Sequence, residues 1–136
     1  MSLRIGKVIA VAALSLGAMP AFAFTSIVGQ RVYQLNENVF EVVPRGRSRT
    51  TDYWCSASEF ARRALGAGWR DRVYIVRGYG PSVATGRRTA VQFTLYPDRA
   101  GVAPLPPGGI RTGLKPGDSM SISQANGFCE PMPRSF

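Results

Sequence analysis

The first 23 residues limit what this chain can fold into, because they have the pattern of an export signal that is removed from the working protein. Arg4 and Lys7 form a short basic region, and an apolar run over residues 8–18 follows it. Residues 21–23 (Ala-Phe-Ala) have the small-x-small pattern of a signal peptidase site. The apolar run is too short to span a bilayer, which takes about 20 residues. We therefore expect cleavage after Ala23 and a periplasmic or secreted domain over residues 24–136 without a membrane span.

The two cysteines, Cys55 and Cys129, are expected to form a disulfide. In an exported protein an even cysteine count indicates a bridge rather than free thiols. There is no Cys-x-x-Cys pair of the kind found in redox sites. A bridge between these positions closes most of the exported chain into one loop, and loop entropy predicts a stabilisation of roughly 4 kcal/mol.

The chain is strongly basic, with 17 Lys+Arg against 8 Asp+Glu and a formal net charge of +9. Lys115 is the only lysine after residue 23. Arginine carries a planar fork of donors that suits carboxylate, phosphate or sulfate. Two interpretations stay open: a genomic bias towards arginine on an ordinary solvated surface, or an anionic partner such as a lipid surface or an acidic protein. Nucleic acid is not excluded, but nothing favours it.

The absence of histidine narrows the chemistry. It excludes Ser-His-Asp and Cys-His catalysis and every zinc site that uses histidine, so we expect no metal and no cofactor. Catalysis by a pair of carboxylates remains, and Glu41 and Asp52 are acids without an evident structural role. Nothing in the sequence links these two, and a domain of this size leaves little room for a substrate cleft. We therefore expect no enzymatic activity, with a carboxylate-based hydrolase as the remaining enzyme class.

Hydrophobic patterning predicts a small α+β domain. Residues 38–43, 72–77 and 88–96 are rich in β-forming residues and predict strands, the last two paired as a hairpin across the loop 78–87. Weaker patterns predict a short strand within 25–34, through Ile27, Val28, Val32 and Tyr33, and a last strand over 119–124. Residues 44–49 and 97–109 predict surface loops, and residues 130–136 a loose tail.

One amphipathic helix is predicted after Cys55. Ser56 and Glu59 fit a capping box, apolar residues recur at helical spacing from 57 to 65, and Gly66 ends the run. The predicted architecture is this helix packed on a four- or five-stranded antiparallel sheet. The disulfide would join the entry of the helix to the last strand, with Trp54 in the core beside it.

Three stretches together resemble a group of small, uncharacterised secreted proteins of alphaproteobacteria. They are Tyr53-Trp54-Cys55 followed by Phe60-Ala61, then residues 80–82 with 85–88 and 91–94, and finally residues 125–129. The resemblance covers about residues 50 to 130. It implies export and the cysteine pair, and it brings no activity, ligand or site with it.

The loop 78–88 is the strongest candidate for a binding site. Its glycines let backbone N–H groups point into one concavity, where nearby guanidinium groups can help to hold an oxyanion. A hairpin connection that needs flexible residues is the simpler alternative. The candidate ligand-binding residues of this loop are Arg77, Ser82, Thr85, Arg87 and Arg88, with the basic loop residues Arg45, Arg47 and Arg49 as a second group.

These patterns favour a non-enzymatic binding domain whose arginine-rich face contacts an anionic surface or an acidic partner. The aromatic residues Tyr53 and Trp54 beside the basic loop leave base or glycan stacking open. The alternative is an inhibitor that inserts its proline-rich loop, 104–109, into a secreted hydrolase, because rigid loops bind at low entropic cost.

Overall fold

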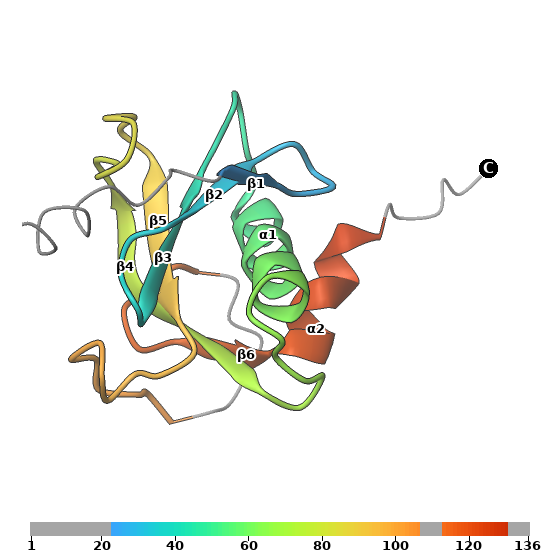
Figure 1. Cartoon of the computed structure of the whole chain (residues 1–136), viewed down its shortest axis with the longest axis vertical. Helices are drawn as coiled ribbons and strands as arrows, with labels where there is room; N and C mark the ends of the chain where they lie inside the picture. The colour runs from blue at the N-terminus through green and yellow to red at the C-terminus, as the bar shows by residue number, and fades with distance from the viewer. Residues whose placement is uncertain (1–22, 107–112, 131–136) are drawn as a thin grey trace, which may run out of the picture.

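The computed structural model describes residues 23–106 and 113–130 and forms one six-stranded antiparallel sheet with helices on one side of it (Figure 1). The strand order across the sheet is β1-β2-β3-β5-β4-β6. The elements in chain order are β1 (Ala23–Thr25), β2 (Arg31–Gln34), β3 (Val39–Val43), α1 (Thr50–Arg63), β4 (Arg72–Gly80), β5 (Ala90–Thr94), β6 (Ser119–Ser121), α2 (Ile122–Asn126) and the 3-10 helix η2 (Gly127–Cys129). The α+β class is confirmed.

The sheet has one strand more than expected because residues 23–34 form a hairpin, not one short strand. Gly29 adopts a positive φ of 87°, and its N–H donates to the Ser26 carbonyl at 2.9 Å, which closes the turn between β1 and β2. Ile27 and Val28 therefore lie in the turn, with Ile27 69% exposed. Placing these two residues in a strand was wrong, because the turn geometry at Gly29 outweighs their β propensity. The other two residues of that predicted strand, Val32 and Tyr33, do lie in a strand, β2. Ala23, where the expected leader ends, is the first residue of β1; residues 1–22 lie outside the described part.

The centre of the sheet agrees with the sequence patterns. β3, β4 and β5 fall within or around the predicted strands, and β4 pairs antiparallel with β5 as the expected hairpin. All five residues of β3 are buried, so both faces of this strand are covered. The loop after β5 follows the surface up to residue 106; the rest of the expected proline-rich loop and the tail beyond residue 130 lie outside the described residues.

The helix begins six residues earlier than predicted, and Cys55 lies inside it, not before it. The Asp52 carboxylate accepts the backbone N–H of Arg49 at 2.8 Å and so satisfies a donor at the helix start. The capping box at Ser56 and Glu59 was wrong. The Ser56 hydroxyl contacts Ser26 and Gln30 of the β1–β2 hairpin instead, and Glu59 accepts the Ile27 N–H at 2.9 Å. The two polar residues thus attach the hairpin to the helix.

The helix ends as predicted, and the last strand does not continue as predicted. Gly66 follows α1 with a positive φ of 73°. β6 stops at Ser121, whose hydroxyl accepts the Gln124 N–H and caps α2. Ile122 and Ala125, three residues apart, are both buried, which is a helical spacing that the serine-rich sequence conceals.

The Cys55–Cys129 disulfide is present, but it joins different elements from those expected. It links the middle of α1 to η2, across a sequence separation of 74. Figure 1 shows α2 beside α1 on the same side of the sheet. The bridge therefore fixes the C-terminal helices against α1.

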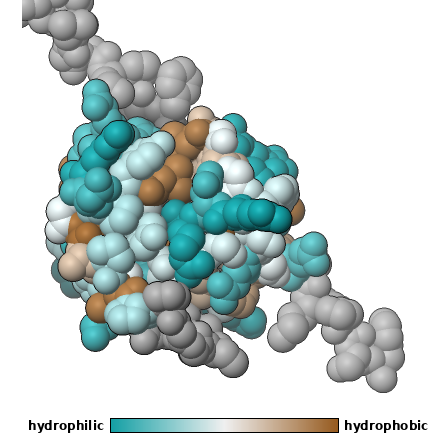
Figure 2. Space-filling model, turned by 90° about the horizontal axis from the view of Figure 1, so that it is seen from below, coloured by the Kyte–Doolittle hydropathy of each residue, from teal (hydrophilic) through white to brown (hydrophobic). Residues whose placement is uncertain are grey.

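The core lies between α1 and the sheet. Trp54 is fully buried, as predicted, and its ring packs edge-on against Phe93 at 5.4 Å between centroids. Phe40 packs between Phe60 of α1 and Phe93 of β5. On the side that carries β6, Figure 2 shows hydrophobic residues in small areas among hydrophilic ones. Within the described residues no helix is long and apolar enough to cross a membrane.

Candidate arginine site

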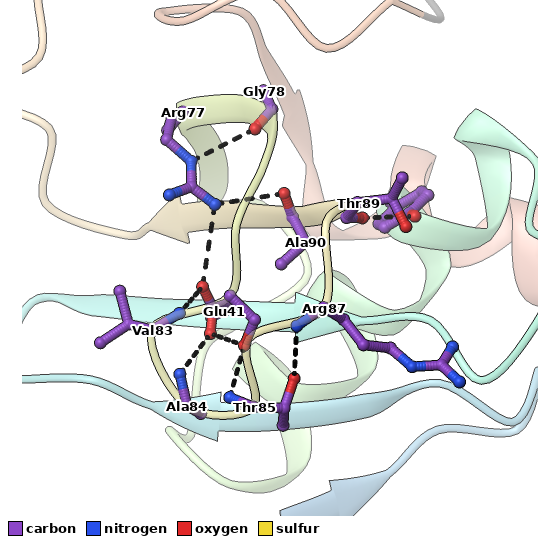
Figure 3. Close-up of polar contacts among 11 residues, drawn as sticks. Glu41, Arg77, Gly78, Val83, Ala84, Thr85, Arg87, Thr89 and Ala90 are labelled. Carbon is purple, nitrogen blue, oxygen red and sulfur yellow. Dashed lines mark hydrogen bonds and ion pairs between the residues drawn. The ribbon is translucent and has the colours of Figure 1, made fainter.

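The loop between β4 and β5 lies on the sheet face opposite α1 and is held there by the side chain of Glu41. This carboxylate is fully buried at the centre of β3. It accepts the Ser82 hydroxyl at 2.8 Å and the backbone N–H groups of Val83 and Ala84 at 3.0 and 3.2 Å. Figure 3 shows these contacts converging on Glu41 from the loop. The concavity predicted to hold an oxyanion therefore contains the chain's own carboxylate.

Arg77 supplies the positive charge beside this carboxylate. Its Nη2 lies 3.8 Å from the Glu41 oxygen and also donates to the Ala90 carbonyl at 3.3 Å. A register shift in β4 between Ile75 and Arg77 turns the arginine towards Glu41. A Cβ at Gly80 would stand 2.9 Å from the Arg77 Nε, so the glycine leaves room for the guanidinium. Arg77 and Ser82 thus stabilise a buried carboxylate, which would otherwise cost several kcal/mol.

The same anchoring positions Thr85 and Arg87 outside the Glu41 contacts. The Arg87 N–H donates to the Thr85 hydroxyl at 3.2 Å, and its Nη1 donates to the Pro44 carbonyl at 2.9 Å. Figure 3 shows the Arg87 side chain extending away from Glu41. Arg87 is therefore fixed at both ends, with its guanidinium beside the end of β3.

Arg87 lies in a hollow of about 350 Å³ that we call the arginine groove. The groove runs between β2, the end of β3 and the β4–β5 loop. Its lining residues are Arg31, Tyr33, Val43, Pro44, Arg45, Thr85 and Arg87. Three arginines thus line one hollow, and no acidic residue lines it with them.

The groove is part of a larger basic surface at one end of the sheet. The strand registers place Arg31 beside Val43 and Ala90 beside Gly80, so the loops 44–49 and 81–89 leave the sheet at the same end. We call this surface the arginine end; its exposed arginines are Arg31, Arg45, Arg47, Arg49, Arg87 and Arg88. The N-terminus of α1 lies there too and adds a partial positive charge.

The acidic residues at the arginine end are occupied or buried. Glu41 and Glu59 are buried, and Asp52 accepts the Arg49 N–H. The opposite end of the sheet differs, because the exposed acids Glu37 and Asp98 lie in the turns after β2 and β5, among other arginines. The charge is therefore mixed at one end and almost wholly positive at the other.

The remaining predicted residues lie around the groove. Arg47 lines a separate hollow of about 250 Å³ with Tyr53 and Tyr79, and Arg49 precedes α1. Arg88 is exposed beside Arg87. Tyr53 and Trp54 are at most 1% exposed, so neither ring is free to stack on a base. Burial raises the pKa of Tyr53 to about 12, and its hydroxyl donates to the Thr89 carbonyl at 2.7 Å.

The two acids without an evident role in the sequence both have structural roles. Glu41 holds the β4–β5 loop, and Asp52 caps α1. Cys55, Glu59 and Cys129 form the one group of possible metal ligands found among the described residues. Both sulfurs are in the disulfide, which leaves a single carboxylate as a ligand.

Sequence reasoning missed Arg31 and Tyr33 of the groove. They alternate along β2 with the buried Val32, so the strand period places both on the face opposite the core. That face could have been suspected as a site from the period alone. Its proximity to residues 45 and 87 depends on the strand order, which the sequence pattern does not reveal.

No protein family matches the sequence, and no curated protein or solved structure shows significant similarity to it. The resemblance to small secreted proteins of alphaproteobacteria therefore stays a prediction.

Proposed function

We propose that this protein is an exported, non-catalytic binding domain whose arginine end contacts an anionic surface or an acidic partner. The observation that carries the proposal is the separation of charge along the sheet. Six exposed arginines gather at one end, where every acid is buried or hydrogen-bonded within the fold. Like charges brought together on one surface raise its potential and attract an anionic partner.

The fold supports the proposal because it holds these arginines on anchored loops. The β4–β5 loop is fixed by Glu41, and the loop 44–49 runs directly into α1. A surface that is already ordered loses less entropy on binding than a flexible basic tail does. A genomic bias towards arginine would raise the arginine content, but it would not by itself gather the arginines at one end of the sheet.

The test compares two triple variants with the same net charge on a sulfated polysaccharide resin. The first, Arg47→Gln/Arg49→Gln/Arg88→Gln, removes charge at the arginine end. The control, Arg63→Gln/Arg70→Gln/Arg99→Gln, removes it elsewhere. We expect the first variant to elute at distinctly lower salt than the control, because local potential governs the contact. Equal elution would mean that net charge alone binds the resin, and the proposal of a specific face would fail.

Export is tested separately. The disulfide is typical of proteins that work in an oxidising compartment. Expression of the whole chain in a bacterium, followed by N-terminal sequencing of the protein from the periplasm and medium, should give Phe24 as the first residue. Recovery of the uncleaved chain from the cytoplasm would contradict this part of the proposal.

A further inference from the structure

We propose that the arginine groove binds a phosphate monoester, held as a dianion by Arg31, Arg45 and Arg87. This inference rests on the proposed function and names the ligand class at the centre of the same surface. It concerns a defined hollow within the arginine end, whereas the proposed function concerns the whole basic surface.

The groove gathers positive charge without internal compensation. Arg31, Arg45 and Arg87 come from β2, the loop after β3 and the β4–β5 loop, and no acid lines the hollow with them. Within the described part of the chain, Arg31 and Arg45 form no ion pair and no side-chain hydrogen bond. Like charges around one hollow repel each other, and a shared anion relieves that repulsion.

The donors match a phosphate monoester better than a carboxylate. Each guanidinium offers five N–H donors and can bind two oxygens of one phosphate. A phosphate monoester offers three terminal oxygens and up to two negative charges near neutral pH, whereas a carboxylate offers two oxygens and one charge. The Thr85 hydroxyl already accepts the Arg87 N–H, so its proton is free to donate to a ligand.

The size and the walls of the groove leave room for more than the phosphate. A hollow of about 350 Å³ lies within the range of small-ligand sites. Val43 and Pro44 form an apolar part of its lining, and Tyr33 adds an aromatic ring. These residues suit a small carbon skeleton attached to the phosphate, such as a polyol or the glycerol of a lipid headgroup.

The groove is organised before any ligand enters. The contacts of Val83 and Ala84 with Glu41 fix the loop, and the hydrogen bond from the Arg87 Nη1 to the Pro44 carbonyl holds the guanidinium beside Pro44. Figure 3 shows the Arg87 side chain extending away from Glu41, and Glu41 does not line the groove, so the carboxylate anchors the loop from outside the groove. Preorganised donors bind an anion with little loss of conformational freedom.

The experiment titrates the exported chain with glycerol phosphate by calorimetry. Arg31→Gln and Arg45→Gln each remove a guanidinium that holds nothing else in the described structure, so neither should unfold the protein. Each is expected to weaken binding by about tenfold or more, because each removes charge-assisted hydrogen bonds. The rim variant Arg47→Gln/Arg49→Gln/Arg88→Gln, with a larger loss of charge outside the groove, should stay within about threefold of the unmodified protein. A greater loss in the rim variant than in the groove variants would overturn the inference.

Vesicles separate the two sources of such a phosphate. Phosphatidic acid carries a phosphate monoester, and phosphatidylglycerol carries a diester at the surface of a comparable anionic membrane. If the groove binds a lipid headgroup, Arg31→Gln and Arg45→Gln should reduce binding to phosphatidic acid vesicles more than to phosphatidylglycerol vesicles. If the ligand is a soluble phosphomonoester, glycerol phosphate should bind and both vesicles should respond alike.

The two proposals fail in different ways. Elution of the rim variant from the polysaccharide resin at lower salt than its distal control, with no binding of glycerol phosphate and equal binding to both vesicles, would overturn the groove inference and leave the arginine end intact. Elution of the rim variant and of its control, Arg63→Gln/Arg70→Gln/Arg99→Gln, at the same salt concentration would overturn the proposed function. Binding of glycerol phosphate through Arg31 and Arg45 would then still support a phosphate site.

Discussion

The two faces of the sheet are covered in different ways, and the contrast is sharpest at two adjacent residues of β3. Phe40 is buried among aromatic rings beneath α1, where many apolar contacts together hold the helix on the sheet. Glu41 is buried on the other face, where one carboxylate accepts three hydrogen bonds from the loop above it. Because the apolar packing is spread over many side chains, the loss of one of them removes only part of it. The hydrogen bonds to the loop all depend on one carboxylate, so its loss removes them together. The candidate site lies on the face with the polar anchor.

Substitutions at Glu41 and Phe40 should give the largest effects and should separate the two faces. Phe40→Ala removes a buried ring, and Glu41→Ala leaves Arg77 and two loop amides without their partner. Each is expected to lower the free energy of unfolding by about 3–5 kcal/mol. Denaturant unfolding curves measure both.

Amide hydrogen exchange distinguishes the two mechanisms. In Glu41→Gln, which keeps the shape of the side chain, the amides of Val83 and Ala84 should exchange faster while those of β5 stay protected. In Phe40→Leu the loop amides should keep their protection relative to the sheet. A uniform rise in exchange in Glu41→Gln would show that the loop is not separately anchored.

Reduction of the disulfide should lower the free energy of unfolding by about 2–4 kcal/mol, because the bridge restricts a long loop of the unfolded chain. The effect belongs to the helix side, where the bridge joins α1 to η2. Unfolding in denaturant with and without reductant measures it, and Cys55→Ala/Cys129→Ala serves as the control without any thiol. Coincident curves would contradict a structural role for the bridge.

Tyr53 should make stability depend on pH at alkaline values. Its pKa is about 12 in the folded protein because the ring is buried, against about 10 when unfolded. The stabilisation is therefore complete below about pH 10 and is lost as pH rises from about 10 to 12. The expected slope is about 1.4 kcal/mol per pH unit. Tyr53→Phe should abolish most of that slope in urea unfolding between about pH 9 and 11; an unchanged slope would contradict the assignment.

Asp52→Ala should give the smallest effect. The substitution removes the acceptor for the Arg49 N–H and a negative charge from the first turn of α1. The expected loss is about 0.5–1 kcal/mol in the free energy of unfolding. Asp52→Asn, which keeps an oxygen acceptor, should lose about half as much. A loss as large as that of Glu41→Ala would show that Asp52 does more than cap the helix.

The sequence predictions were accurate where a feature depends on neighbouring residues and wrong where it depends on contacts with distant segments. The β-rich runs of β3, β4 and β5 and the glycine after α1 are local signals, and they were confirmed. The start of α1 was wrong because Ser56 and Glu59 match a capping box in sequence, although both side chains bind the β1–β2 hairpin. The last strand was confirmed at Ser119–Ser121 and wrong beyond it, because a serine can end a strand by capping a helix.

The sequence by itself determined the α+β class, the cysteine pair, the buried Trp54 and the positive charge, because each depends on residue type or on a short period. Only the tertiary structure decided where the arginines lie and which of them the fold uses. The order of the strands brings Arg31 beside residues 45 and 87, and the burial of Glu41 assigns Arg77 and Ser82 to the fold. Charge is a property of composition, but a binding groove requires charges from distant segments at one place, and only the folded sheet supplies that.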